Sequence, residues 1–225
     1  MLERLHEIPG VLLSADEYLD DFWPNFRRID DVFWKLERTQ SFRDPGEPGW
    51  TALLDAEWER SLKLIDDGQG LAVMSEGTAG NGHAGDSGGP GGREGAGGGG
   101  RQVVSVPRRR IRIVEQPVTP YLQWEMHVLA MRVRAAEQVR VLDAGEVAEL
   151  EVGRRLPELV VLGTRVMYEV TYDESGRHSG ARRIDDREVI VACQGELDKL
   201  FATGEEFRAY YEREIVPLPS PRVTA

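Results

Sequence analysis

The sequence lacks most of the features by which an unfamiliar chain reveals its chemistry. It contains one cysteine, Cys193, which excludes an intramolecular disulfide and a zinc site built from several cysteines. Its four histidines lie far apart, and none has a second histidine three to five residues away. No Gly-Lys pair is present, which excludes the phosphate-binding P-loop. We therefore expect neither a metal site nor another cofactor.

Positive charge is also in short supply. The 225 residues include 28 Lys and Arg against 39 Asp and Glu, which gives a formal net charge of −11. Such a surface repels phosphate backbones and anionic membranes, so direct nucleic-acid binding is disfavoured. No run approaches the roughly 18 apolar residues that a membrane span requires, and the first residues lack the pattern of a signal peptide. We expect a soluble, cytoplasmic protein in which Cys193 is a small buried side chain.

Glycine, by contrast, is concentrated in one stretch. Of the 24 residues from 77 to 100, 13 are glycine, and none carries an apolar side chain larger than alanine apart from one proline. Such a segment buries too little surface to offset its backbone entropy, so a flexible insertion is predicted over 77–102. Strand-like residues precede it at 71–74 and follow it at 103–106, which favours an insertion within one domain over a domain boundary.

Two motifs inside this stretch match known catalytic or cofactor patterns. Residues 85–89 spell Gly-Asp-Ser-Gly-Gly, the nucleophile motif of trypsin-like proteases, with His83 close by. Residues 80–85 match the dinucleotide-binding pattern of three spaced glycines. The first chemistry requires a rigid oxyanion hole and the second a strand followed directly by a helix. A glycine-rich run supplies neither, so both matches are interpreted as coincidence.

The clearest structural signal lies between Arg110 and Leu142. Residues 110–114 alternate as a half-buried strand does, Thr119 and Pro120 form the N-cap and first turn of a helix, and residues 139–142 alternate again. This order predicts a β-α-β unit. Weaker patterns predict the remaining elements. Before the glycine-rich stretch they are a helix that follows the capping box of Ser14 and Glu17 and that Pro24 interrupts or kinks, a strand over 32–39 and a helix over 50–66. After the β-α-β unit they are a short helix over 144–150, a hairpin of 159–162 and 166–172, a strand over 180–184, and a helix capped by Asp185 and Asp186 and broken near Gly195 and Gly204.

These elements predict an α/β protein of the α+β type, in which a mixed sheet contains the β-α-β unit and a hairpin and helices pack on it. Residues 14–76 are expected to form a helical or mixed N-terminal part of the core and 103–216 the α/β core. The end of the chain, 217–225, contains three prolines and is expected to be a disordered tail.

Three segments carry a resemblance to a known family. Residues 114–117, the sequence Tyr-Leu-Gln-Trp-Glu at 121–125, and residues 136–142 together resemble an actinobacterial family of unknown function, whose helix carries Tyr-Leu-x-aromatic-Glu and whose next strand carries Arg-Val-Leu. The resemblance covers Val103 to about Tyr211, and 26–66 more loosely. Members are often encoded beside helix-turn-helix regulators, which implies a regulatory or toxin-antitoxin-like setting with such a regulator as protein partner.

The order of elements also resembles, distantly, half of a phospholipase-D-type domain. That class requires a histidine and a lysine two residues apart, and neither His127 nor His178 has a lysine at that place. The catalytic site of the class is therefore not expected. His127 is predicted to be hydrogen-bonded or exposed, and His178 to lie solvated in a turn.

A row of arginines occupies the first strand of the β-α-β unit. On a strand, Arg108, Arg110 and Arg112 share one face. Such a row either binds a phosphate, a nucleic acid or an acidic partner, or keeps an exposed sheet edge soluble, and the exposed edge is the favoured interpretation.

Two functions follow from the helix over 120–134. Leu122, Met126, Leu129 and Val133 form its expected core stripe, which leaves Tyr121, Glu125 and Arg132 on another side. The first hypothesis is a non-catalytic regulatory or partner-binding protein that displays Tyr121, a half-exposed Trp124 and Glu125. In the other packing, Tyr121 and Trp124 are core and Glu125 pairs with an arginine.

The second hypothesis is an enzyme, a hydrolase or a nucleotide-directed toxin, with carboxylates and arginines in one cleft. The candidate residues of the two hypotheses together are Glu37, Arg38, Tyr121, Trp124, Glu125 and Arg132. Binding is favoured over catalysis, because no set of residues has the spacing of a known catalytic site.

Overall fold

The computed structural model describes residues 1–29, 31–43, 47–67 and 106–222. The predicted insertion at 77–102, the two motifs within it, the strand predicted at 71–74 and residues 103–105 lie outside these ranges.

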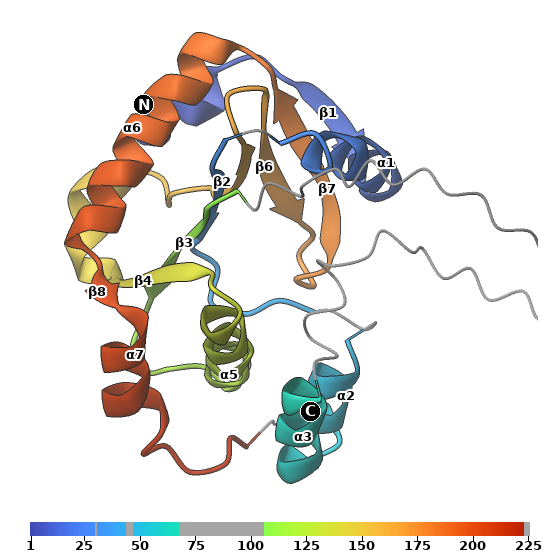
Figure 1. The fold of residues 1–225 in the computed structure, drawn as a ribbon, viewed down its shortest axis with the longest axis vertical. Helices are drawn as coiled ribbons and strands as arrows, with labels where there is room; N and C mark the ends of the chain where they lie inside the picture. Colours follow the sequence, from blue (N-terminus) through green and yellow to red (C-terminus); the bar gives the residue numbers. More distant parts are fainter. Residues whose placement is uncertain (30, 44–46, 68–105, 223–225) are drawn as a thin grey trace, which may run out of the picture.

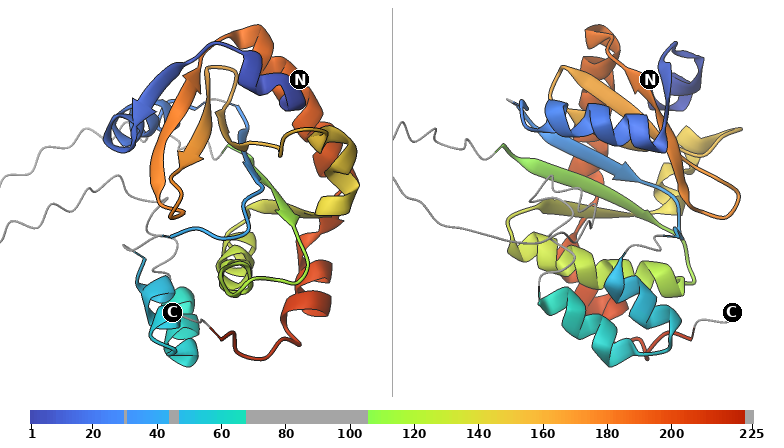
Figure 2. Two further views of the ribbon diagram at one scale, coloured as in Figure 1. Left: turned by 180° about the vertical axis from the view of Figure 1, so that it is seen from behind. Right: turned by 90° about the vertical axis from the view of Figure 1, so that its right-hand side faces the viewer.

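In the described part of the chain, eight strands form one mixed sheet in the order β1-β7-β6-β5-β2-β3-β4-β8 (Figure 1). The strands are β1 (Val11–Ser14), β2 (Phe33–Glu37), β3 (Arg108–Val114), β4 (Gln138–Asp143), β5 (Glu158–Leu162), β6 (Val166–Tyr172), β7 (His178–Ile184) and β8 (Glu205–Glu206). Strands β2 and β4 run parallel to β3, and the other neighbouring pairs are antiparallel. The sheet curves, so one of its faces is concave (Figures 1 and 2).

Helices cover both faces of the sheet. The helical elements are η1 (Leu2–Glu7), α1 (Ala15–Phe26), α2 (Pro48–Leu54), α3 (Trp58–Asp66), α5 (Pro120–Arg134), η2 (Ala144–Glu151), α6 (Arg187–Thr203), α7 (Phe207–Tyr210) and η3 (Tyr211–Ile215). Helix α6 crosses the convex face, whereas α1 and α5 lie at opposite ends of the concave face (Figure 2). Helices α2 and α3 pack beside α5, on its side away from the sheet.

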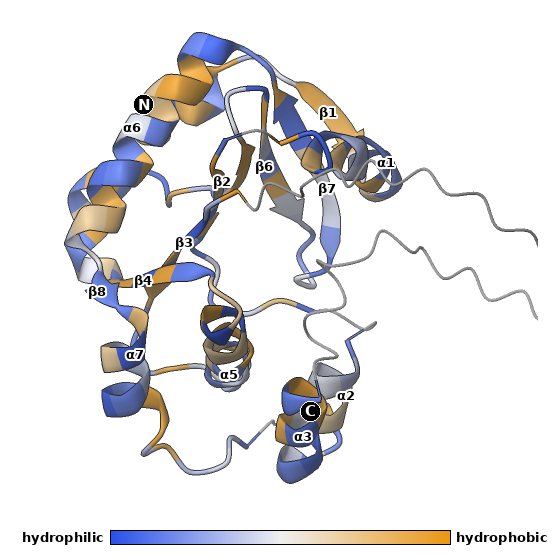
Figure 3. Ribbon diagram, in the orientation of Figure 1, coloured by the Kyte–Doolittle hydropathy of each residue, from blue (hydrophilic) through white to orange (hydrophobic). Residues whose placement is uncertain are grey.

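The two faces of the central strands have different chemistry because side chains alternate along a strand. Trp34 and Leu36 of β2, together with Ile111 and Ile113 of β3, point to the convex face, where they pack against Ile190, Cys193 and Leu197 of α6. Figure 3 shows hydrophobic and hydrophilic positions mixed along α6, as expected of a helix with one buried stripe. Cys193 is buried and free, as predicted.

The β-α-β unit is confirmed. Strands β3 and β4 are parallel neighbours, and α5 connects them. The Thr119 hydroxyl accepts a hydrogen bond from the Leu122 amide at 3.0 Å, and Pro120 opens the helix. The predicted core stripe of α5 is also correct, since Leu122, Met126 and Leu129 pack on β4 with Val133 beside them.

Several local predictions hold as well. The capping box of Ser14 and Glu17 begins α1, the hairpin of β5 and β6 turns at Gly163, and Asp186 caps α6. The predicted fold class, a mixed α/β arrangement with helices packed on the sheet, is confirmed. Within the described ranges, none of the helices has the length and apolar composition needed to traverse a bilayer.

Three predictions about the elements are wrong. The helix expected over 50–66 is two helices, α2 and α3, because the chain turns at Ala56 in the left-handed region with φ of 59°. Gly195 does not break α6, which runs on to Thr203. The strand that carries the arginine row is not an exposed edge, since β3 lies between β2 and β4 near the middle of the sheet.

Candidate functional site

A pocket of about 610 Å³ opens on the concave face of the sheet, between α1 and α5. Its floor comes from the central strands, where Phe33, Lys35 and Glu37 of β2 alternate with residues of the convex core. Val160 of β5 and Arg110 of β3 continue the floor, and the side chains of α1 and α5 form two of its walls. We call this the concave pocket.

A row of alternating charges crosses the floor of the concave pocket, and all its members except Glu137 line the pocket. Lys35 Nζ and Arg110 Nη1 each lie 2.6 Å from Glu37 Oε1. Arg110 Nε donates to Glu137 Oε1 at 2.6 Å, and Arg132 Nη1 lies 3.8 Å from Glu137 Oε2. This ion-pair chain, Lys35–Glu37–Arg110–Glu137–Arg132, joins β2, β3 and α5 through the residue that precedes β4. Its middle members are nearly inaccessible to solvent, whereas the Lys35 side chain is 31% exposed.

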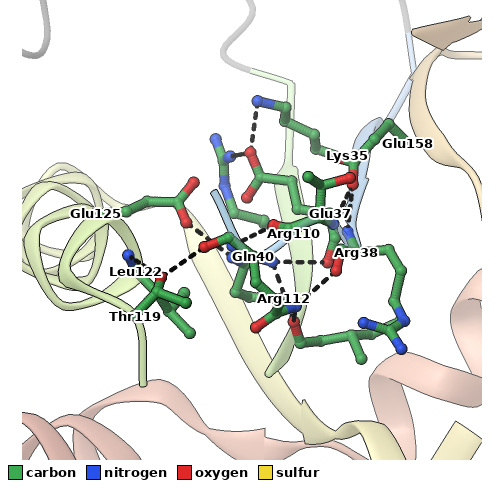
Figure 4. A network of polar contacts seen from close by, with 12 residues as sticks. Lys35, Glu37, Arg38, Gln40, Arg110, Arg112, Thr119, Leu122, Glu125 and Glu158 are labelled. Atoms are coloured by element: carbon green, nitrogen blue, oxygen red, sulfur yellow. Dashed lines mark hydrogen bonds and ion pairs between the residues drawn. The ribbon is translucent and has the colours of Figure 1, made fainter. Parts of the chain in front are cut away.

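A second buried pair ties β3 to α5. Arg112 Nε donates to Glu125 Oε2 at 2.8 Å (Figure 4). The remaining guanidinium nitrogens of Arg112 donate to backbone carbonyls, including that of Thr39 at 2.7 Å. Gln40 donates to the carbonyls of Arg38 and Ile113, which fixes the chain just beyond β2. The arginine row is thus buried because carboxylates and carbonyls from neighbouring segments satisfy it.

One wall of the concave pocket is aromatic. Phe42 lies 4.4 Å from Tyr172 and 5.4 Å from Tyr121, measured between ring centroids. Tyr121 is followed by Trp124 at 5.6 Å, and on the other side the His178 ring lies 6.0 Å from that of Tyr172. We call these five side chains the aromatic arc. All of them line the pocket, and most pairs meet in tilted or edge-to-face contact.

The electrostatic environment shifts the pKa values of two carboxylates of the pocket, Glu37 and Glu125, in opposite directions. Burial on its own raises the pKa of Glu37, but attraction to Arg110, Lys35 and Arg112 outweighs it and holds the pKa well below its usual range. Burial raises the pKa of Glu125, and Arg112 offsets only part of that rise. For Arg132, burial and repulsion by Arg110 lower the pKa of the guanidinium.

Two polar atoms of the pocket walls are buried without a hydrogen-bond partner in the described part of the chain. They are Glu37 Oε2 and Trp124 Nε1. An unsatisfied buried polar group costs about 1–3 kcal/mol. Such groups are rare in folded proteins, and their presence in one pocket is typical of a site built for a further partner.

Most of the candidate residues from the sequence meet in the concave pocket. Glu37, Tyr121, Trp124, Glu125 and Arg132 all line it. Arg38 does not, because it follows Glu37 directly along the strand and its side chain points the other way. There it pairs with Glu151 at 2.6 Å and Glu115 at 2.7 Å.

The sequence left two packings of these residues open, and the structure distinguishes them. Trp124 is not half-exposed but 5% exposed, and Tyr121 and Glu125 are similarly buried. The alternative packing is correct in that Glu125 pairs with an arginine. The helix therefore presents no aromatic and acidic patch at the molecular surface.

Several pocket residues were missed by sequence reasoning. They are Tyr18, Lys35, Phe42 and Tyr172, whereas Arg110 belongs to the arginine row that the sequence already singled out. For Lys35 a signal was available, because it alternates with Phe33 and Glu37 on one face of a predicted strand. The aromatic residues gave no local signal, since each comes from a different element.

His127 and His178 have structural partners. His127 Nδ1 lies 2.7 Å from the Tyr211 hydroxyl, which confirms the prediction of a hydrogen-bonded residue. His178 is not solvated in a turn as predicted, because it begins β7 with its ring 5.1 Å from that of Tyr18. Among the residues that the structure describes, no group of three His, Cys, Asp or Glu side chains has the geometry to hold a metal ion.

Comparison with known proteins identifies one related family. Residues 102–212 match the model of a family described as a domain of unknown function (DUF6879). This range agrees with the predicted resemblance to a family of unknown function over 103–211, and to that extent the prediction is confirmed. Its actinobacterial origin, its helix motif and its neighbouring regulators stay predictions. No curated protein and no solved structure matches the chain, so the distant likeness to phospholipase D also stays a prediction.

Proposed function

We propose that this protein is a non-catalytic binding protein that takes a small molecule into the concave pocket. The observation that supports this most strongly is that a buried ion-pair chain and an aromatic arc line one pocket of about 610 Å³. Ligand sites are typically clefts of about 300–1,000 Å³ with apolar walls and a few fixed polar groups, and this pocket has that composition.

The burial of the candidate residues favours a small ligand over a macromolecule. Tyr121, Trp124 and Glu125 are each less than a tenth exposed. A docking protein contacts side chains that protrude, whereas these side chains are accessible only from within the pocket. The partner-binding role expected from the sequence is therefore proposed here as ligand binding.

The chemistry of the lining favours binding over catalysis. None of the described residues that line the pocket is Ser, Thr or Cys, the side chains most often used as nucleophiles. Glu37 has a pKa held far below neutrality, which makes it a weak general base. The ion pairs also fix these groups in place, as recognition requires.

Ligand-detected NMR with a library of small aromatic fragments tests this proposal. In the variant Val128→Trp, a bulky ring replaces a side chain of the pocket wall. The matched control is Arg134→Trp on the same helix, whose side chain is 59% exposed and outside the pocket lining. We expect fragments that bind the wild type and the control but not Val128→Trp, with all three proteins folded by circular dichroism. If the fragments bind Val128→Trp as well as they bind the wild type, or if no fragment binds at all, the proposal is contradicted.

One observation favours a second candidate function, a hydrolase or a nucleotide-directed toxin-like enzyme. Two carboxylates of the same pocket, Glu37 and Glu125, have their pKa values shifted in opposite directions. Such a separation is typical of an acid and base pair in an active site. Growth arrest on expression that Glu125→Gln relieves, or turnover of nucleotides, phosphodiesters or esters by the purified protein, supports the enzyme. A harmless wild type without turnover contradicts it.

We further propose that the protein acts with a helix-turn-helix regulator in the cytoplasm. The support is the resemblance seen in the sequence and the single free, buried cysteine, which suits a reducing compartment. A tagged copy should retain the regulator encoded beside its gene in a pull-down. If neither the tagged wild type nor tagged Val128→Trp retains the neighbouring regulator in the pull-down, this part of the proposal is wrong.

A further inference from the structure

We infer that the ligand of the concave pocket is a small aromatic anion, in which a planar ring lies against the aromatic arc and an acidic group lies near Lys35. This inference rests on the proposed ligand-binding function and assigns it a class of ligand.

The pocket concentrates charge of the sign opposite to that of the whole protein. Among the described residues, five cationic side chains line it against three carboxylates, a difference of two positive charges. The cations are Lys35, Arg43, Arg110, Arg132 and Arg177, and the carboxylates are Glu37, Glu47 and Glu125. The complete chain has a formal net charge of −11. Because a cleft with low-dielectric walls focuses the field of its lining charges, an anion is attracted into this pocket although the protein as a whole repels it.

The ion-pair chain locates the excess charge. Within it Glu37 has two cationic partners, since Lys35 Nζ and Arg110 Nη1 each lie 2.6 Å from Glu37 Oε1. Burial, together with repulsion by Arg110, lowers the pKa of Arg132. An acidic group beside the chain offsets this repulsion, whereas a cationic ligand adds to it.

Lys35 is the member of the chain best placed to meet a ligand. Arg110 is held between two carboxylates and is 3% exposed, so it has no freedom to turn. Lys35 has a side-chain exposure of 31% and shares Glu37 Oε1 with Arg110, so Glu37 keeps a cationic partner if Lys35 turns away. A lysine ammonium on its flexible stem binds an acidic group as a point charge.

The aromatic arc indicates what kind of group the non-acidic part of the ligand is. Phe42, Tyr121, Trp124 and Tyr172 all line the pocket and contact one another in series, which favours a planar aromatic group over a flexible aliphatic one. Trp124 Nε1 is a buried donor without a hydrogen-bond partner in the described ranges, and it suits a ligand rich in acceptors. Glu37 Oε2 is a spare acceptor, but the negative charge of that carboxylate is already matched by two cations.

Matched naphthalene probes test the inference. Four compounds share one ring and differ in their charged group, namely naphthalene-2-carboxylate, 2-naphthyl phosphate, naphthalene-2-carboxamide and 2-naphthylmethylamine. Their dissociation constants are measured on the full chain by ligand-detected NMR. We expect at least one of the two anions to bind at least tenfold more tightly than the carboxamide, and the amine to bind most weakly. The better of the two anions tells whether the acidic group is a carboxylate or a phosphate.

Two variants assign the charge preference to the pocket. Lys35→Gln should reduce the preference for the anion over the carboxamide at least threefold, while carboxamide binding stays within twofold of wild type. The control Arg134→Gln removes a cation from the exposed side of α5 and should leave all four constants unchanged. Retained carboxamide binding shows that Lys35→Gln is folded.

The outcomes separate the two proposals. Equal binding of the four probes, or an anion preference that Lys35→Gln does not alter, overturns the inference and leaves the proposed binding function intact. If no naphthalene binds although other fragments bind in a manner that Val128→Trp abolishes, the inference again fails alone. If nothing binds, both proposals are wrong.

Discussion

Arg112 of β3 and Glu125 of α5 form an ion pair inside the molecule, with 2.8 Å between Nε and Oε2 and with 0% and 8% of the side chains exposed. The pair connects a central strand to the helix that forms one end of the pocket. Both side chains are buried, so the desolvation cost of each charge is offset by its attraction to the other. The consequence for stability is therefore asymmetric, since losing one partner is worse than changing both.

The variant Arg112→Met should lower the free energy of unfolding by about 3–5 kcal/mol, because it leaves the Glu125 carboxylate buried without its cation. The double variant Arg112→Met/Glu125→Met should recover a large part of that loss. Urea unfolding followed by circular dichroism measures both. Arg134→Met, which removes an exposed pair with Asp66, is the control and should leave the midpoint unchanged. Equal losses in the single and double variants contradict this account.

Glu37 should make the protein sensitive to acid. Its folded-state pKa lies below the ordinary value of 4.5, because the attraction of three cations outweighs burial. The stability that Glu37 contributes is therefore complete above about pH 4.5 and is lost as the pH falls from there towards the lower folded pKa. The urea midpoint of the wild type should drop between pH 5 and pH 3, and Glu37→Gln should show a smaller drop from a lower starting value. Parallel curves for the two proteins rule this out.

Glu125 should behave in the opposite sense. Burial raises its folded-state pKa above 4.5, so any stability linked to its titration is present below that value and lost as the pH rises through the raised pKa. Glu125→Gln, which keeps an acceptor for Arg112, should therefore cost less at pH 7 than Arg112→Met. A loss as large as that of Arg112→Met indicates that the charge on Glu125, and not its hydrogen bond, holds α5 to the sheet.

His127 links α5 to the C-terminal segment through Tyr211, and this contact should weaken on mild acidification. Burial lowers the pKa of His127 below 6.5, although Asp66 opposes the shift. The neutral imidazole is thus favoured in the folded protein, and the stability it contributes is present above about pH 6.5 and lost as the pH falls below it. Thermal unfolding between pH 7.5 and pH 5.5 should show a decline in Tm that is smaller in His127→Gln.

The left-handed residue between α2 and α3 is another testable point. An alanine at φ of 59° costs roughly 1–2 kcal/mol, and glycine relieves that strain while adding freedom to the unfolded chain. Ala56→Gly should therefore raise the free energy of unfolding by about 0.5 kcal/mol. Ala130→Gly, inside α5, should lower it by about 1 kcal/mol. If both glycines destabilise alike, the turn at Ala56 carries no strain.

The sequence predicted what is local in the fold. The alternation in 110–114, the cap at Thr119 and the hairpin around Gly163 are each determined within about a dozen residues, and each is present in the structure. The break at Ala56 gave no such signal, because neither glycine nor proline occurs between α2 and α3 and the helical period continues across the gap.

The site was less predictable because its parts are distant in sequence. Glu37 meets Arg110 only since β2 pairs in parallel with β3, across a separation of 73 residues. The row of arginines was interpreted as an exposed edge because the partners that bury it are distant in sequence. Nothing in 108–112 itself indicates that carboxylates from β2, from α5 and from the residue before β4 will surround it.

The residues of the ion-pair chain come from both sides of the boundary of the matched family range, and this affects any attempt to divide the protein. The matched family range begins at residue 102, yet Lys35 and Glu37 come from the other side of that boundary, and β2 fills the gap between β5 and β3. A fragment that starts at 102 would keep Arg110 and Arg112 with Glu137 and Glu125, but it would lose Glu37 and the carbonyls of the segment after β2. A separate peptide of residues 1–67 would supply the missing Glu37 and backbone carbonyls. The two pieces are therefore suited to serve as the halves of a split reporter.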